Sequence, residues 1–194
     1  MAEDLLRQWR KKPLSLLAGE EPLSALKSNP MWRILHWGEA ELEQLLPHRS
    51  PFLLCRKLCG FAPVGLENSP PGLLWGQSYL APEDPIFKGH FPDFPIYPGV
   101  LQIEMLGQLG LCLGYFQELY KNAGPEDIAP SRLNIRASKI LGAHYLAPVL
   151  PGQTVDLLAC QVGQNNGFFA SMLGQLLVGT QVAMVCVLEV CFVD

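Results

Sequence analysis

One histidine and one glutamate in the stretch "KGHFPDFPIYPGVLQIEMLGQ" are the side chains best suited to carry chemistry. His90 lies in a proline-rich loop, directly after Gly89, which permits unusual backbone angles or the close approach of a ligand. Glu104 lies in an apolar run, where a carboxylate must be paired, hydrogen-bonded, neutral or functional. Together they are the residue types of a general base and a general acid. Taken singly, each also fits a structural role, bonded to a nearby carbonyl, backbone group or water.

A helix must position Glu104. Pro98 and Gly99 open an apolar segment that runs to about Tyr120, and proline is favoured in the first turn of a helix. The segment is apolar nearly all round, which predicts a helix buried on every side. Glu104 is too far into this helix to be a capping residue, whereas Gln108, four residues on, shares its face and can orient it.

Short apolar segments on both sides of the helix predict antiparallel strands. Asn166–Gly167 between two of them predicts a hairpin turn. Residues 81–99 are too rich in proline for regular structure and predict an ordered, irregular loop. One long helix among five or six strands indicates an α+β domain with the sheet wrapped on the helix. The predicted strands lie within residues 51–65, 72–82, 132–146, 154–164, 168–179 and 180–193.

Residues 1–38 are expected to form an N-terminal extension of unknown role before a main domain of residues 39–194. A short helix is predicted before Pro13, and a second one in "GEAELEQLL". Exposed tryptophans are disfavoured, so Trp9, Trp32 and Trp37 predict docking against the main domain or a partner.

Composition narrows the functional classes. The chain has 194 residues, 49% hydrophobic and 16% charged, with a net charge of −4. Such a chain can bury a core, and its low charge suggests surface hidden in an oligomer. The negative balance argues against nucleic-acid binding. The 6 cysteines lack metal-ligand spacing and indicate a reducing, cytoplasmic compartment, and neither a secretory signal nor a membrane span is expected.

Three segments carry a family resemblance: "LLPHRSPFLL", "GHFPDFPIYPGVLQIEMLGQ" and "YLAPVLPGQ". In this order they resemble the FabZ/FabA family of 3-hydroxyacyl-acyl carrier protein dehydratases, and more closely the FabZ branch, which has glutamate where FabA has aspartate. The resemblance covers about residues 39–192. It implies a hotdog fold and a homodimer, alone or in a trimer of dimers. It also implies that each site takes His90 from one subunit and Glu104 from the other, so that the dimer covers the glutamate.

The reaction implied by the resemblance is reversible dehydration of a 3-hydroxyacyl thioester to the trans-2-enoyl thioester, in fatty-acid or related lipid or polyketide biosynthesis. His90 would remove the C2 proton, and Glu104 would protonate the departing C3 hydroxyl. Backbone N–H groups at the helix start would polarise the thioester carbonyl. The resemblance implies no metal or redox cofactor. The 4'-phosphopantetheine arm that bears the acyl group belongs to the acyl carrier protein, or to CoA, and is therefore part of the substrate. The residues assigned to substrate binding are Phe91, Tyr97, Gly99, Val100 and Gln108.

Two departures from the family pattern concern the loop and the carrier surface. Asp93 replaces the glycine of GHFPG, and the stretch before "APVLPGQ" is less basic than usual, which leaves Arg132, Arg136 and Lys139 as carrier-docking candidates. These differences suggest a specialised paralogue. The family loop also leads us to expect a cis peptide bond between His90 and Phe91.

Two other functions remain open from the sequence. The resemblance also implies a tunnel along the apolar helix that would hold the acyl chain. A hotdog acyl thioesterase would use the same tunnel but activate water for attack at the carbonyl, and a non-catalytic acyl-binding or scaffold subunit would use it only for binding. The remaining histidines receive structural interpretations: His48 in "LLPHRSPFLL" as a turn residue, His144 as a packing residue, and His36 as part of a docking patch in the extension.

Overall fold

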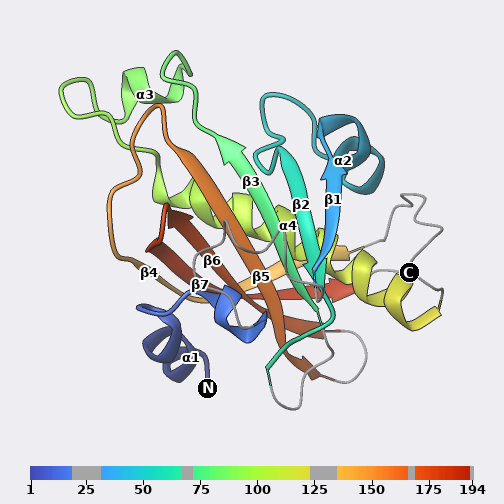
Figure 1. The fold of residues 1–194 in the computed structure, drawn as a ribbon. Coiled ribbons are helices and arrows are strands. Elements are labelled where there is room, and N and C mark those ends of the chain that lie inside the picture. The colour runs from blue at the N-terminus through green and yellow to red at the C-terminus, as the bar shows by residue number, and fades with distance from the viewer. Residues whose placement is uncertain (19–31, 67–71, 123–134, 166–168, 193–194) are drawn as a thin grey trace.

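An antiparallel sheet of seven strands curves around one long helix in the computed structural model (Figure 1). The structure describes residues 1–18, 32–66, 72–122, 135–165 and 169–192. The strand order is β1-β2-β3-β5-β6-β7-β4, so the strand that follows the long helix returns to an outer edge of the sheet. The elements are α1 (Ala2–Trp9), the 3-10 helix η1 (Leu14–Ala18), β1 (Arg33–Trp37), α2 (Glu39–Leu45), β2 (Lys57–Ala62), β3 (Leu73–Tyr79), α3 (Ile86–Gly89), α4 (Gly99–Asn122), β4 (Ile135–Tyr145), β5 (Thr154–Asn165), β6 (Phe169–Val178) and β7 (Gln181–Phe192).

The long helix α4 begins where the proline–glycine pair predicts it. Gln102 N–H donates to Pro98 C=O at 3.2 Å, which closes the first turn. One side of α4 packs against the sheet through Met105, Leu106 and Leu109, all fully buried. The expectation that the helix is buried on every side holds for its middle turns, where residues 105–110 and 112–117 are all buried, but is wrong for its first turns, which are open on one side in the single chain. Val100 is 71% exposed, and residues Leu101, Ile103, Glu104 and Leu111 are only half-buried.

The sheet is buried on both faces, because successive side chains of a strand point in opposite directions. In β7, Met184 and Cys186 belong to the core around α4, whereas Val185 and Val187 belong to a second core on the other face. That second core is completed by the N-terminal segment, through Leu6, Trp9, Leu14 and Trp32. The fold therefore has three layers: α4, the sheet, and the segment of α1 and η1 (Figure 1).

One buried glutamine attaches the N-terminal segment to the sheet. Gln175 of β6 accepts a hydrogen bond from Leu14 N–H at 2.7 Å and donates to the carbonyls of Trp9 and Lys12 at 2.6 and 2.8 Å. Trp9 and Trp32 are 6% and 5% exposed, which confirms the prediction that tryptophans of this region dock on the main domain. Trp37 packs against the Phe116 ring of α4 at a centroid distance of 5.2 Å.

Two features differ from the sequence-based prediction. The sheet has seven strands instead of five or six, since Arg33–Trp37 pairs with β2 as an edge strand and lies inside the segment predicted to be an extension. The proline-rich loop contains one short helical turn, α3. The Asn166–Gly167 turn lies outside the described residues, but β5 and β6 pair antiparallel as far as Asn165 and Phe169, as a hairpin requires. Among the described residues, no helix is long and apolar enough to cross a membrane.

Candidate active site

The loop after α3 holds His90 in one orientation. Its Nδ1 lies 3.0 Å from the carbonyl oxygen of Ile96, and its own carbonyl accepts a hydrogen bond from Ile96 N–H at 2.9 Å. Its ring stacks on Phe91 at 4.1 Å, and the peptide bond between the two residues is cis, as the resemblance led us to expect. A carbonyl can only accept, so the Nδ1 contact requires a proton on Nδ1. In a neutral ring, the lone pair is then on Nε2.

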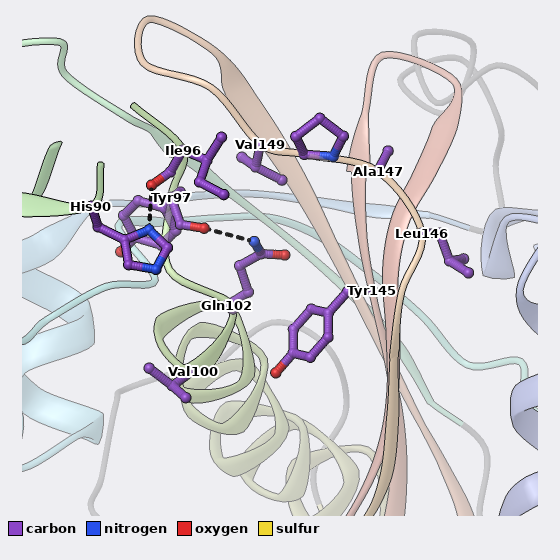
Figure 2. A pocket seen from close by; sticks show the side chains of 11 residues that line it. His90, Ile96, Tyr97, Val100, Gln102, Tyr145, Leu146, Ala147 and Val149 are labelled. Carbon is purple, nitrogen blue, oxygen red and sulfur yellow. Dashed lines mark hydrogen bonds between the residues drawn. The ribbon is translucent and has the colours of Figure 1, made fainter. Parts of the chain in front are cut away.

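A pocket of about 570 Å³ lies in front of His90 (Figure 2). The start of α4 forms one wall through Gly99, Val100 and Gln102. The other wall runs from Tyr145 to Val149, so the pocket lies between the helix start and the end of strand β4. The lining is predominantly apolar, which suits an acyl chain or the apolar part of a thioester.

Three of the five predicted substrate-binding residues line this pocket: Tyr97, Gly99 and Val100. Phe91 stacks on the His90 ring, is half-exposed and does not line the pocket. Burial, with a smaller contribution from the negative charge of Asp84, raises the pKa of Tyr97 to about 12, so its phenol stays neutral in the pocket. Asp93, the departure from the family loop, is exposed and does not line the pocket.

The start of α4 can receive a developing negative charge. The first N–H groups of a helix have no partner within the helix, and the helix dipole favours negative charge there. A side chain at Gly99 would meet the ring of Tyr145, since a Cβ would lie 2.4 Å from Tyr145 Cε1. Gly99 therefore permits the helix start and the β4 end to approach each other. Gln102 braces this turn by donating from Nε2 to the Tyr97 carbonyl at 3.1 Å.

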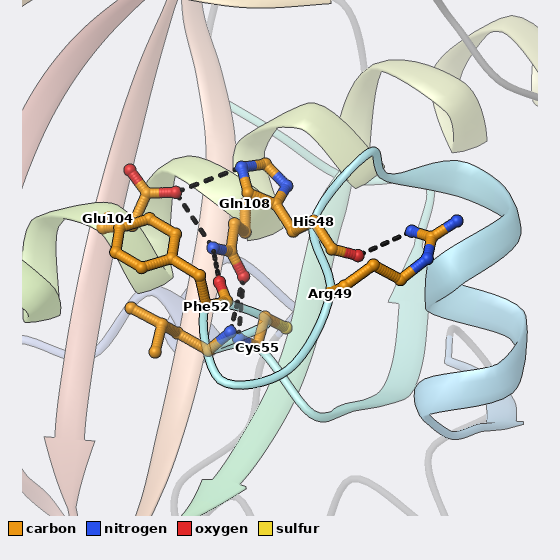
Figure 3. Close-up of polar contacts among 7 residues, drawn as sticks. His48, Arg49, Phe52, Cys55, Glu104 and Gln108 are labelled. Carbon is orange, nitrogen blue, oxygen red and sulfur yellow. Dashed lines mark hydrogen bonds and ion pairs between the residues drawn. The ribbon is translucent and has the colours of Figure 1, made fainter.

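Glu104 lies in a separate polar cluster on the open side of α4 (Figure 3). Its Oε1 accepts a hydrogen bond from Gln108 Nε2 at 2.9 Å and lies 3.3 Å from His48 Nε2. The Glu104 side chain is 33% exposed. The prediction that Gln108 orients Glu104 across one helical turn is confirmed.

Gln108 is itself fixed by the segment that precedes β2. Its Oε1 accepts from the N–H groups of Leu54 and Cys55 at 2.8 and 3.1 Å, and its Nε2 also donates to the Phe52 carbonyl at 2.9 Å. The side chain is 1% exposed. Because both ends of the amide are occupied, the donor that faces Glu104 cannot rotate away without breaking buried hydrogen bonds.

The sequence interpretation of His48 as only a turn residue missed its contact with Glu104. The loop after α2 brings His48 over α4, where its ring also stacks on Phe52 at 6.4 Å. Its Nδ1 is buried and has no hydrogen-bond partner among the residues that the structure describes. The sequence did contain a signal that His48 could belong to the site, because "LLPHRSPFLL" is one of the three segments that carry the resemblance.

Within one chain, His90 and Glu104 do not share a pocket. Glu104 follows Val100 by one helical turn but is not among the residues that line the His90 pocket. The structure thus gathers the predicted residues into two groups, one around His90 and one around Glu104 on the open side of α4. Among the described residues, no group of three or more His, Cys, Asp or Glu could hold a metal ion.

Strand β4 is the outer strand on this side of the sheet and adjoins the His90 pocket. Its side chains include Ile140 and Tyr145, which are 57% and 52% exposed. Arg136 and Lys139, two of the carrier-docking candidates, are exposed on the same strand, whereas Arg132 lies outside the described residues. A long edge strand with exposed apolar side chains is a ready surface for pairing with another chain.

Comparisons with a protein-family model and with known sequences both show similarity to dehydratases. The family model of ApeI-like dehydratases matches residues 74–173. The 3-hydroxyacyl-[acyl-carrier-protein] dehydratase FabZ of Polynucleobacter asymbioticus is 35% identical over 137 residues, which cover 68% of this chain and 74% of the relative. FabZ of Campylobacter lari is 30% identical over 154 residues, covering 79% and 96%.

Solved structures show the fold. The dehydratase heterocomplex ApeI:P from Xenorhabdus doucetiae superimposes with a TM-score of 0.50 at 15% identity, over 84% of this chain and 93% of that one. A homologue of HP0420 from Helicobacter felis superimposes with a TM-score of 0.50 at 12% identity, over 78% and 87%. The predicted α+β hotdog fold, a long central helix wrapped by an antiparallel sheet, is confirmed.

Proposed function

The chain belongs to the family of FabZ 3-hydroxyacyl-[acyl-carrier-protein] dehydratases, and on that basis we propose that it dehydrates a 3-hydroxyacyl thioester borne by an acyl carrier protein. The product is the trans-2-enoyl thioester, and the reaction is reversible. One observation of the site carries this assignment: the Ile96 carbonyl fixes the proton of His90 on Nδ1 and leaves Nε2 as a base at the edge of an apolar pocket.

In the first step, His90 Nε2 takes a proton from C2 of the substrate. The imidazolium that forms is stabilised by the hydrogen bond from Nδ1–H to the Ile96 carbonyl. The C2 proton becomes acidic enough only if negative charge can move to the thioester carbonyl oxygen. The N–H groups of Gly99 and Val100, at the positive end of the α4 dipole, are the donors for that oxygen.

In the second step, Glu104 delivers a proton to the C3 hydroxyl, which leaves as water. His48 and Gln108 both contact Oε1, so Oε2 is the oxygen available to the substrate. The proton taken by His90 then returns to Glu104 through solvent, which restores the starting state. Proton transfer coupled to loss of water needs no metal or redox cofactor, and the 4'-phosphopantetheine arm arrives with the substrate.

The complete site requires two subunits. In one chain Glu104 does not reach the His90 pocket, the α4 face that bears it is open, and β4 leaves an exposed edge. A homodimer that joins two β4 edges would cover both surfaces and bring the partner's Glu104 to His90. Assembly into a trimer of dimers remains a prediction. The six cysteines form no disulfide within the described residues and five of them are buried, which supports the expectation of a reducing, cytoplasmic compartment.

The test of this assignment mixes two inactive variants. His90→Ala and Glu104→Gln are each expected to lower the hydration of a crotonyl thioester on the order of a hundredfold or more, measured as loss of enoyl absorbance. When the two variants are co-expressed, a mixed dimer contains one site with both residues intact. Random pairing should therefore restore about a quarter of wild-type activity. A mixture as inactive as its components would contradict the shared site.

The same assay separates dehydration from thioester hydrolysis. A thioesterase would release a free thiol in proportion to substrate consumed, whereas hydration of the enoyl group leaves the thioester intact. Thiol release that depends on His90 and matches the loss of absorbance would overturn the proposal in favour of hydrolysis.

A further inference from the structure

A second hollow lies beside the His90 pocket, between the end of α1 and the start of β7. It has a volume of about 600 Å³ and is lined by Arg10, Lys11, Leu146, Thr180, Gln181 and Val182. Leu146 also lines the His90 pocket, so the two hollows share this side chain as a wall. We refer to this second space as the Arg10–Lys11 hollow.

The Arg10–Lys11 hollow is positively charged. Arg10 and Lys11 are exposed, no Asp or Glu lines the hollow, and neither cation forms an ion pair in the described part of the chain. Arg7, one turn earlier, pairs with Glu3 at 3.0 Å. Residues 7–12 contain four of the 14 Lys and Arg residues of a chain whose net charge is −4. Two cations without an ion pair in the described residues therefore face the hollow, in a chain whose net charge is negative.

The fold holds these two cations in place. The carbonyls of Trp9 and Lys12, which bracket Arg10 and Lys11, accept hydrogen bonds from Gln175 Nε2 at 2.6 and 2.8 Å. Gln175 is fully buried, and Trp9 is buried in the core between α1 and the sheet. The backbone on both sides of the two cationic residues is thus attached to β6, which fixes where their side chains leave the surface.

We infer that an acidic acyl carrier protein docks on the Arg10–Lys11 hollow when it delivers its thioester to His90. The inference rests on the proposed function. Leu146 lines both spaces, so a thioester arm that left the His90 pocket past Leu146 would come directly to the two cations. Carrier proteins are acidic, and complementary charge steers such partners and sets their register.

This assignment differs from the one based on sequence. Arg136 and Lys139 lie on β4, line neither hollow, and would be at or near the subunit boundary of the proposed dimer. The N-terminal segment, for which the sequence suggested no role, would instead supply the charges that select the substrate carrier.

The experiment compares three substrates with the same acyl group: the carrier-protein thioester, the CoA thioester and the N-acetylcysteamine thioester. The variant is Arg10→Glu with Lys11→Glu, and a milder form carries alanine at both positions. For the carrier-protein substrate we expect KM to rise on the order of tenfold or more, with kcat unchanged. KM for the other two substrates should stay within twofold. Lys57→Glu, an exposed charge reversal on the distant strand β2, is the matched control and should change none of them.

Each other outcome overturns the inference. An unchanged KM for the carrier-protein substrate means that the carrier docks elsewhere. An equal rise for the carrier and CoA substrates means that the hollow binds the phosphate common to both arms. A loss of activity with all three substrates, or a lowered melting temperature of the variant with alanine at both positions, assigns the two cations a structural role. If the proposed function itself is wrong, the wild type will not turn over the N-acetylcysteamine thioester at all. This result distinguishes a failure of the proposed function from a failure of the docking inference.

Discussion

His48 Nε2 lies 3.3 Å from Glu104 Oε1, the same carboxylate oxygen that accepts the hydrogen bond from Gln108. Two neighbours on one oxygen fix the plane of the carboxyl group and leave the second oxygen to face outward from α4. His48 contacts no residue of the His90 pocket in the described structure, so its effect on the reaction would pass through Glu104. We therefore assign His48 as a positioning residue.

Replacement of His48 is expected to impair turnover more than binding. His48→Ala should lower kcat roughly tenfold to a hundredfold with little change in KM, because Glu104 loses one of the two contacts that orient it. His48→Gln keeps an N–H donor at a similar reach and should recover most of the loss. Steady-state kinetics with the N-acetylcysteamine thioester checks both values. Equal losses in the two variants, or a loss confined to KM, would contradict the positioning role.

Gly99 and Tyr145 are expected to be coupled. A Cβ at position 99 would lie 2.4 Å from Tyr145 Cε1, while the backbone of Gly99 is in a region open to alanine. Gly99→Ala should therefore displace the Tyr145 ring and lower kcat/KM about tenfold. Tyr145→Ala makes room for the methyl group, so the double variant should lose less than the sum of the two single losses. A double-mutant cycle on kcat/KM measures this, and strictly additive losses would show that the ring does not oppose the substitution.

Loss of the Gln175 amide is expected to loosen the N-terminal segment. Gln175→Leu leaves the Leu14 N–H and the carbonyls of Trp9 and Lys12 without their partner, and each buried group left unsatisfied costs about 1–3 kcal/mol. Urea denaturation should show lower stability, and amide exchange should speed up across residues 5–14. Gln44→Leu is the control, because Gln44 is exposed and its one hydrogen bond within the described residues goes to the Ala40 carbonyl. Equal stability of the two variants would contradict the anchoring role.

Local sequence was sufficient to predict the part of the site that lies on α4. Pro98 and Gly99 mark the start of the helix, and the helical period places Gln108 on Glu104 whatever the rest of the chain does. The positions of the strands along the chain after α4 followed from apolar segments separated by turn residues. The resemblance supplied the hotdog arrangement and the pairing of His90 with Glu104 across subunits.

Contacts between distant segments could not be predicted in the same way. His48 reaches Glu104 only because the loop after α2 passes over α4, and nothing in the local sequence measures that approach. Strand β1 has only one buried side chain, Leu35, among its five residues, so its pattern is weak and its pairing with β2 decides its structure. The second core depends on Gln175, which the sequence shows only as one polar residue in an apolar strand.

Asp156 on β5 is expected to make stability depend on pH. Its Oδ1 accepts hydrogen bonds from Trp75 Nε1 and Gln77 Nε2 at 2.8 and 3.0 Å, yet burial outweighs both and raises the pKa of this carboxyl above 3.8. Between 3.8 and the raised pKa the folded state binds the proton more tightly, so stability falls as pH rises through that window and stays lower above it.

Asp156→Asn keeps an oxygen acceptor without the charge. It should be more stable than the wild type at pH 7, by a margin that shrinks as the pH falls toward 3.8. Urea denaturation at several pH values checks this, with the exposed Asp93→Asn as the control for net charge. A variant less stable than the wild type at pH 7 would show that the two hydrogen bonds to the carboxylate outweigh its burial.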